Sequence, residues 1–154
     1  MKARIDTRHV SPNAYKAMRD FQASVDATSL ERSLQELVKI RASQINGCAF
    51  CLHMHTRDAR KAGESQERLD LLDAWREAPG FTPRERAALA WSEAVTLIAD
   101  THVSDDVYEA ARREFSEQEL VDLTMAVVAI NGWNRLMIAF SIPPAVAVRA
   151  DSDG

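Results

Sequence analysis

Helix-start signals recur along the whole chain, and they constrain its fold more than any other feature. The segment 82–85 (TPRE) joins a capping box to a proline at the first helical position. Ser116 with Glu119 forms a second box, and Thr28 with Glu31 forms a third. No segment alternates apolar and polar residues with the period of a β-strand. The sequence therefore predicts an all-α fold.

Helical spacing of apolar residues between these signals predicts a bundle of about seven helices. The length of 154 residues suits one domain, 1–154, with a core at about 15–140 and a flexible tail at 145–154. The last helix, expected to reach about Phe140, is apolar nearly all round from 123 to 130, so we expect it at the centre of the bundle. The expected helices begin near Ser11, Thr28, Cys48, Ser65, Thr82, Ser104 and Ser116.

Composition and charge argue against several functional classes. The net charge is −4, and acidic and basic residues are interspersed throughout the chain. This pattern offers no basic surface for nucleic acid and no polybasic patch for a membrane. The N-terminal segment lacks the apolar region of a secretory signal, and no apolar run is long enough to span a bilayer. We therefore expect a cytoplasmic protein, in which a close cysteine pair is typical of catalysis or metal binding.

The segment 46–55 (NGCAFCLHMH) concentrates the residues that can carry chemistry. Cys48 and Cys51 are three residues apart, and His55 follows four residues later, so a helix places all three on one face. Gly47 is expected to end the preceding helix in a left-handed conformation, which puts Cys48 at a helix N-terminus. His53 points to a different side and is expected at the surface or at an interface.

These residue types suit thiol redox chemistry. Two cysteines at this spacing can close a disulfide, and the helix N-terminus favours the thiolate form of Cys48. His55 can exchange a proton with Cys51 near neutral pH. A carboxylate behind the imidazole would fix its tautomer, and Glu36 on the preceding helix is a candidate. Spacing alone leaves three other carboxylates open for that role: Glu31, Asp58 and Glu64.

The pattern Glu36-x11-Cys48-x2-Cys51-x3-His55 resembles the signature of the alkylhydroperoxidase (AhpD-like) branch of the carboxymuconolactone decarboxylase family. The segments 82–90 (TPRERAALA) and 131–135 (NGWNR) also resemble that family's single-domain members. The resemblance covers about residues 15–140. It implies an AhpD-like helical fold that needs no cofactor and no metal.

The resemblance also implies roles for individual residues. Cys48 and Cys51 would cycle between dithiol and disulfide while reducing a hydroperoxide, with Glu36 and His55 as a proton relay. The reductant would be a dithiol or a thioredoxin-like or lipoyl partner, and the protein a homo-oligomer, a trimer or hexamer. The family favours attack by Cys51, whereas the helix dipole favours Cys48. Phe50 replaces a histidine of the best-characterised members, so we expect slow peroxide turnover or a different acceptor.

Other readings of the same residues stay open. The cysteines could be core residues, or they could bind zinc with His55 and a fourth ligand in a redox- or zinc-sensing interaction protein. A decarboxylase-like lyase on the same scaffold would not need the sulfurs.

Two further groups of residues have open roles. Three polar residues in the apolar last helix could pair within the bundle, cross a subunit interface or line the thiol pocket: Asn131, Asn134 and Arg135. Three aromatic residues are read as core or subunit contacts: Trp91, Trp133 and Phe140.

Overall fold

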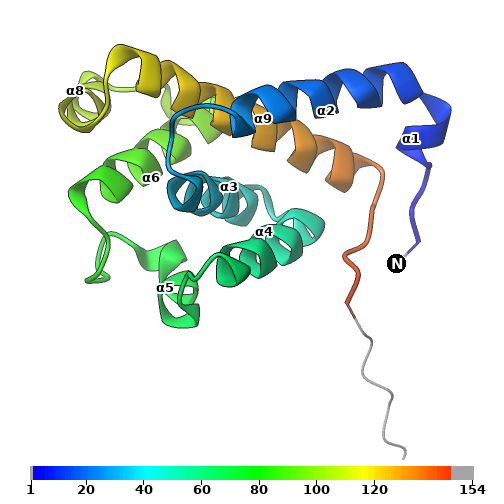
Figure 1. Ribbon diagram of the computed structural model, residues 1–154, viewed down its shortest axis with the longest axis horizontal. Helices are drawn as coiled ribbons and strands as arrows, with labels where there is room; N and C mark the ends of the chain where they lie inside the picture. The colour runs from blue at the N-terminus through cyan, green and yellow to red at the C-terminus, as the bar shows by residue number, and fades with distance from the viewer. Residues whose placement is uncertain (1, 147–154) are drawn as a thin grey trace, which may run out of the picture.

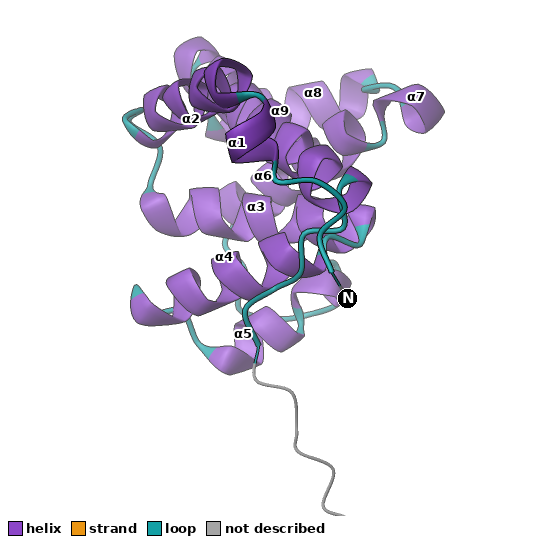
Figure 2. Ribbon diagram, turned by 90° about the vertical axis from the view of Figure 1, so that its right-hand side faces the viewer, coloured by secondary structure: helices purple, strands orange, loops and turns teal. Residues whose placement is uncertain are grey.

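The computed structural model describes residues 2–146, and the predicted flexible tail lies outside this part of the chain from residue 147 onward. Within the described residues the fold is all-α and contains no strand (Figures 1 and 2). No helix there is long and apolar enough to cross a membrane. The elements are α1 (Thr7–Val10), α2 (Pro12–Asp26), α3 (Arg32–Asn46), α4 (Ala49–Lys61), α5 (Gln66–Asp70), the 3-10 helix η1 (Leu72–Ala74), α6 (Pro83–Thr96), α7 (Ile98–Thr101), α8 (Asp105–Glu114) and α9 (Glu117–Ala139).

The central helix of the bundle is α3. It packs against α4 on one side and against α6 and α9 on others, and every residue from Leu34 to Ile40 is buried. In Figure 2, α3 lies between a layer that contains α2 and α9 and a layer that contains α4 and α5. The expectation that the last helix forms the centre is therefore wrong. Although α9 packs on α2, α3 and α6, it leaves one stripe exposed, with Val121, Met125 and Val128 on it.

Most of the predicted helix starts are confirmed. Both hydrogen bonds of the capping box are present at Thr82 and at Ser116, where α6 and α9 begin. The predicted box at Thr28 is wrong, because α3 begins after Glu31 without a side-chain cap. The Thr28 hydroxyl instead donates a hydrogen bond of 2.9 Å to the carbonyl of Val25, so it stabilises the end of α2.

The described residues contain more helices than predicted, because α1 precedes the first predicted start at Ser11 and two expected helices are divided. The helix predicted to begin near Ser65 ends already at Asp70, and η1 and a turn follow. The helix predicted to begin near Thr82 ends at Thr96 and is followed by the short α7.

Candidate active site

The turn between α3 and α4 places the two cysteines. Gly47 ends α3 with φ 69°, a left-handed conformation that L side chains rarely adopt. Cys48 is the N-cap of α4, and its Sγ accepts a hydrogen bond of 3.3 Å from the backbone N–H of Cys51. The start of α4 thus directs an N–H group at the first sulfur, as expected at a helix N-terminus.

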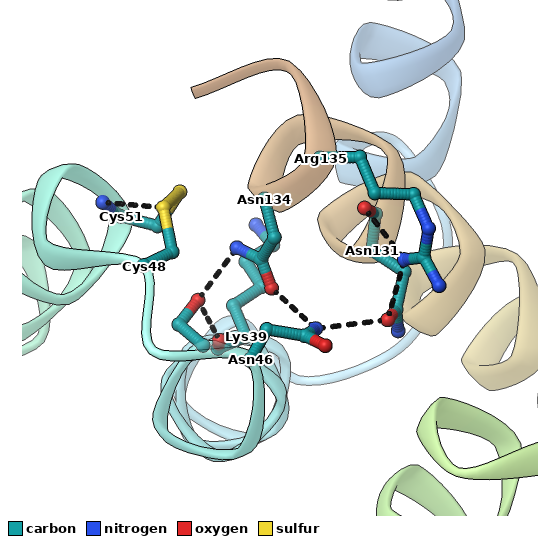
Figure 3. Close-up of a disulfide and its surroundings, with 8 residues drawn as sticks. Lys39, Asn46, Cys48, Cys51, Asn131, Asn134 and Arg135 are labelled. Atoms are coloured by element: carbon teal, nitrogen blue, oxygen red, sulfur yellow. Dashed lines mark hydrogen bonds between the residues drawn. A yellow bond between two sulfur atoms is a disulfide. The ribbon is translucent and has the colours of Figure 1, made fainter. Parts of the chain in front are cut away.

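Cys48 and Cys51 form a disulfide, with 5.4 Å between their Cα atoms (Figure 3). Each residue is only 1% exposed. They share a small apolar cluster with Ala42, Ile130 and Met137, so α3, α4 and α9 all contribute to their surroundings. The structure therefore describes the oxidised form of the pair.

The imidazole of His55 meets a carboxylate on α3. Its Nδ1 lies 2.8 Å from Oε2 of Glu36, and both residues are buried. The three alternative carboxylates are engaged elsewhere: Glu31 with Arg84, Asp58 with Arg57, and Glu64 with Arg68. Packing of α4 against α3 therefore selects Glu36 among the candidates that spacing left open.

Glu36 is also paired with a buried cation that the sequence analysis did not single out. Nζ of Lys39 lies 3.3 Å from Oε1 of Glu36 and 3.0 Å from Oδ1 of Asp26, at the end of α2. Burial by itself raises the pKa of Glu36, but the hydrogen bond with His55 and the nearby Lys39 more than offset this. The net pKa of Glu36 lies below its ordinary value of 4.5, so the carboxylate is ionised at neutral pH.

A cavity of about 440 Å³ reaches this group of residues. Cys51, His55 and Glu36 line it, whereas Cys48 and His53 are not among the lining residues. A volume of this size suits a small organic molecule. Its apolar wall is formed by Tyr15, Phe50, Met54, Trp133 and Met137.

The polar residues of α9 pair inside the bundle. The side-chain amide of Asn46 donates hydrogen bonds of 2.9 Å to the Oδ1 atoms of both Asn131 and Asn134 (Figure 3). Asn134 donates in turn to the Ser43 hydroxyl at 3.0 Å, and Arg135 donates to Asn131. None of these three polar residues of α9 lines the cavity beside Cys51. They fix the last turn of α3 against α9, and hence the position of the turn at Gly47.

The three aromatic residues lie in different places, and the half-buried Phe140 lines a separate cavity next to α1. Trp91 is buried in the core and donates a hydrogen bond to Thr124. Trp133 belongs to the wall of the cavity beside Cys51, where its ring meets Tyr15 edge to face at 5.4 Å between centroids. The sequence signal for Lys39 was its position three residues after Glu36, which places the two side chains on one side of the same helix.

A sequence model of the carboxymuconolactone decarboxylase family matches residues 12–94, which is more than half of the chain. The chain belongs to the carboxymuconolactone decarboxylase family. A curated relative, YdfG of Bacillus subtilis, is 43% identical over 139 residues, which cover 90% of this chain and 95% of that protein. YnjA of Escherichia coli is 31% identical over 115 residues, covering 74% of this chain and 62% of YnjA.

Solved structures share the fold. ATU0492 of Agrobacterium tumefaciens, a protein of unknown function described as a candidate antioxidant defence protein AhpD, superimposes with a TM-score of 0.93 at 43% identity. That match covers 95% of this chain and all of the other. An alkylhydroperoxidase AhpD core from Ralstonia eutropha gives a TM-score of 0.79 at 20% identity, over 90% of this chain and 74% of the other. The debrominase Bmp8 gives 0.82 at 18% identity, over 91% and 75%. The last two show the fold alone.

Proposed function

We propose that this member of the carboxymuconolactone decarboxylase family is a thiol-dependent peroxidase, a disulfide oxidoreductase that reduces organic hydroperoxides. The observation that supports it most directly is the wall of the cavity. Cys51 of the Cys-x-x-Cys disulfide lines the cavity together with His55, whose imidazole is hydrogen-bonded to a buried, ionised carboxylate.

The geometry favours Cys51 as the attacking sulfur and Cys48 as the resolving one, since only Cys51 lines the cavity. The Cys51 thiolate attacks the terminal oxygen of the hydroperoxide and the O–O bond breaks. Cys51 becomes a sulfenic acid, and the departing alkoxide takes up a proton to leave as the alcohol. The Cys48 thiol then attacks the Cys51 sulfur, an S–S bond forms, and the hydroxyl leaves as water with the thiol proton.

A dithiol reductant closes the cycle by opening the disulfide and becoming a disulfide itself. No organic cofactor or metal is needed, because the dithiol supplies both electrons. Candidate donors are a small dithiol or a thioredoxin-like or lipoyl partner.

His55 and Glu36 move the protons in this scheme. Because Nδ1 of His55 is engaged by Glu36, Nε2 is the nitrogen that takes the proton of the Cys51 thiol and returns it to the alkoxide. Phe50 lines the cavity where better-known members carry a second histidine, so this site works with a single imidazole and an apolar wall.

Turnover of cumene hydroperoxide with dithiothreitol tests the proposal. We expect Cys51→Ser to abolish turnover. Cys48→Ser should still form a trappable sulfenic acid at Cys51 but no disulfide. Equal turnover in the wild type and both serine variants would remove the peroxidase hypothesis. His55→Ala should slow alkylation of Cys51 about a hundredfold at neutral pH, whereas the matched control His53→Ala should not.

The two alternatives have distinct signatures. A zinc-sensing protein would bind stoichiometric zinc when reduced, which metal analysis of the purified protein measures. A decarboxylase-like lyase would keep its activity in the double serine variant. We also propose that the protein is cytoplasmic and that it assembles as a homo-oligomer, a trimer or hexamer. Sedimentation velocity of the purified protein tests the assembly.

A further inference from the structure

The charged residues that line the cavity beside Cys51 differ in their pairing: the carboxylates have cationic partners, whereas the three arginines have none within the described part of the chain. Its three carboxylates each have a cation within 3.3 Å: Asp26 and Glu36 share Lys39, and Asp58 pairs with Arg57. Because Asp26 and Glu36 share the single charge of Lys39, the three carboxylates and their two cations leave one net negative charge for a ligand to meet.

Three arginines line the same cavity and have no such partner. Arg8, Arg19 and Arg32 are exposed, and none of them forms a salt bridge or a side-chain hydrogen bond with any residue between 2 and 146. The guanidinium of Arg8 lies over the ring of Tyr15, 5.6 Å from its centroid, so it projects toward the apolar wall. They come from α1, α2 and the first residue of α3, so three separate elements bring positive charge to one rim.

This rim is unusual for the chain as a whole. The protein carries a net charge of −4, and most of the other arginines among residues 2–146 are engaged, for example Arg41, Arg68 and Arg84. Guanidinium groups are donors suited to carboxylates and phosphates. A cationic rim around an apolar wall, with a reactive sulfur in that wall, matches an amphiphilic ligand.

We propose that the cavity selects an amphiphilic anion, a molecule with an apolar body and one anionic end group, most simply a carboxylate. The apolar body packs on Tyr15, Phe50 and Trp133, and the anionic end meets the arginine rim. Binding of this molecule does not depend on the proposed function, but its role as a reactant does. Either the hydroperoxide or the dithiol reductant can carry the anionic group, and the two half-reactions separate these sources.

Protection of Cys51 from alkylation tests the binding without any peroxide. The reduced protein is treated with iodoacetamide, and the rate at Cys51 is measured by peptide mass spectrometry in the presence of hexanoate or hexanamide. An exposed ion pair changes affinity by about 1.5- to 5-fold, so with several arginines we expect hexanoate to protect at roughly three- to tenfold lower concentration. The difference should shrink at high salt.

Variants locate the effect. In the double variant Arg19→Gln/Arg32→Gln, which keeps Arg8, most of the preference for hexanoate over hexanamide should be lost, whereas Arg113→Gln on the exposed side of α8 should behave like the wild type. Equal protection by hexanoate and hexanamide in the wild type, or a hexanoate preference in the double variant as large as in the wild type, would overturn the inference. So would an absence of protection by either probe.

The two half-reactions then identify the reactant. Oxidation of the dithiol form is timed with a carboxylate-bearing hydroperoxide and its methyl ester, and reduction of the disulfide with dihydrolipoate and dihydrolipoamide. If the double variant is slowed only with the carboxylate-bearing hydroperoxide, the hydroperoxide carries the anion; if it is slowed only with dihydrolipoate, the reductant carries it. No slowing with either carboxylate compound counts against the proposal. A protein that shows protection but no peroxide turnover keeps this site and loses the proposed function.

Discussion

Replacing Lys39 by methionine removes the cation that joins α2 to the proposed proton relay. Nζ of Lys39 lies between Asp26, at 3.0 Å, and Glu36, at 3.3 Å, and the lysine side chain is only 6% exposed. Methionine keeps an unbranched apolar chain in this space but leaves the Glu36 carboxylate without its cationic neighbour. The variant therefore isolates the charge of Lys39 from its packing.

The size of the effect follows from the burial of the two partners. Removing one partner of a buried ion pair costs about 3–5 kcal/mol. The Glu36 side chain is 5% exposed, so this range applies to it, but it keeps the 2.8 Å contact with His55. Asp26 is 41% exposed, so water screens its ion pair with Lys39, which contributes only about 0–1 kcal/mol to the free energy of unfolding. We expect Lys39→Met to lower the free energy of unfolding by about 3 kcal/mol.

Urea denaturation of the reduced protein, followed by its helical circular dichroism at fixed protein concentration and pH 7, measures this change. Lys16→Met is the matched control, because Lys16 pairs with Asp20 at 2.5 Å on the exposed side of α2. It should change stability by less than about 0.5 kcal/mol. Adding Glu36→Gln should cost less in the Lys39→Met background than in the wild type, because the two residues interact.

A Lys39→Met protein as stable as the Lys16→Met control would refute the reasoning. So would equal costs of Glu36→Gln in the two backgrounds, since that result shows no coupling between Lys39 and the carboxylate.

Two further predictions concern the same region. Because the folded pKa of Glu36 lies below 4.5, its ionisation stabilises the fold above about pH 4.5, and this contribution is lost as the pH falls through the folded pKa. The stability difference between the wild type and Glu36→Gln should therefore shrink on acidification, and urea titrations that show a constant difference would contradict it. Asn134→Leu should lower the free energy of unfolding by about 1–3 kcal/mol, because Asn46 and Ser43 lose a buried partner. Thermal unfolding of this variant within a degree of the wild type would rule out a stabilising role for the amide network.

Local signals in the sequence determined the helices and much of the candidate site. A capping box or a left-handed glycine involves only a few neighbouring residues, so Thr82, Ser116 and Gly47 could be read directly. The missed start of α3 shows the limit: the Thr28 hydroxyl found a closer acceptor in the preceding helix. The offset from Cys51 to His55 likewise lies within one helix, and both residues do line one cavity.

Contacts between separate helices were decided by the tertiary structure alone. Spacing left Glu36 among four carboxylates, and only the packing of α4 on α3 brings it to His55. The pairing of Lys39 with Asp26, and the gathering of arginines from α1, α2 and α3 at one rim, depend on how those helices are arranged. Helix periodicity says which side of a helix is apolar, but it does not say which other helix that side meets. The chain by itself therefore specified most of its helices and the placement of its cysteine pair at a helix start, and the packed bundle determined what surrounds them.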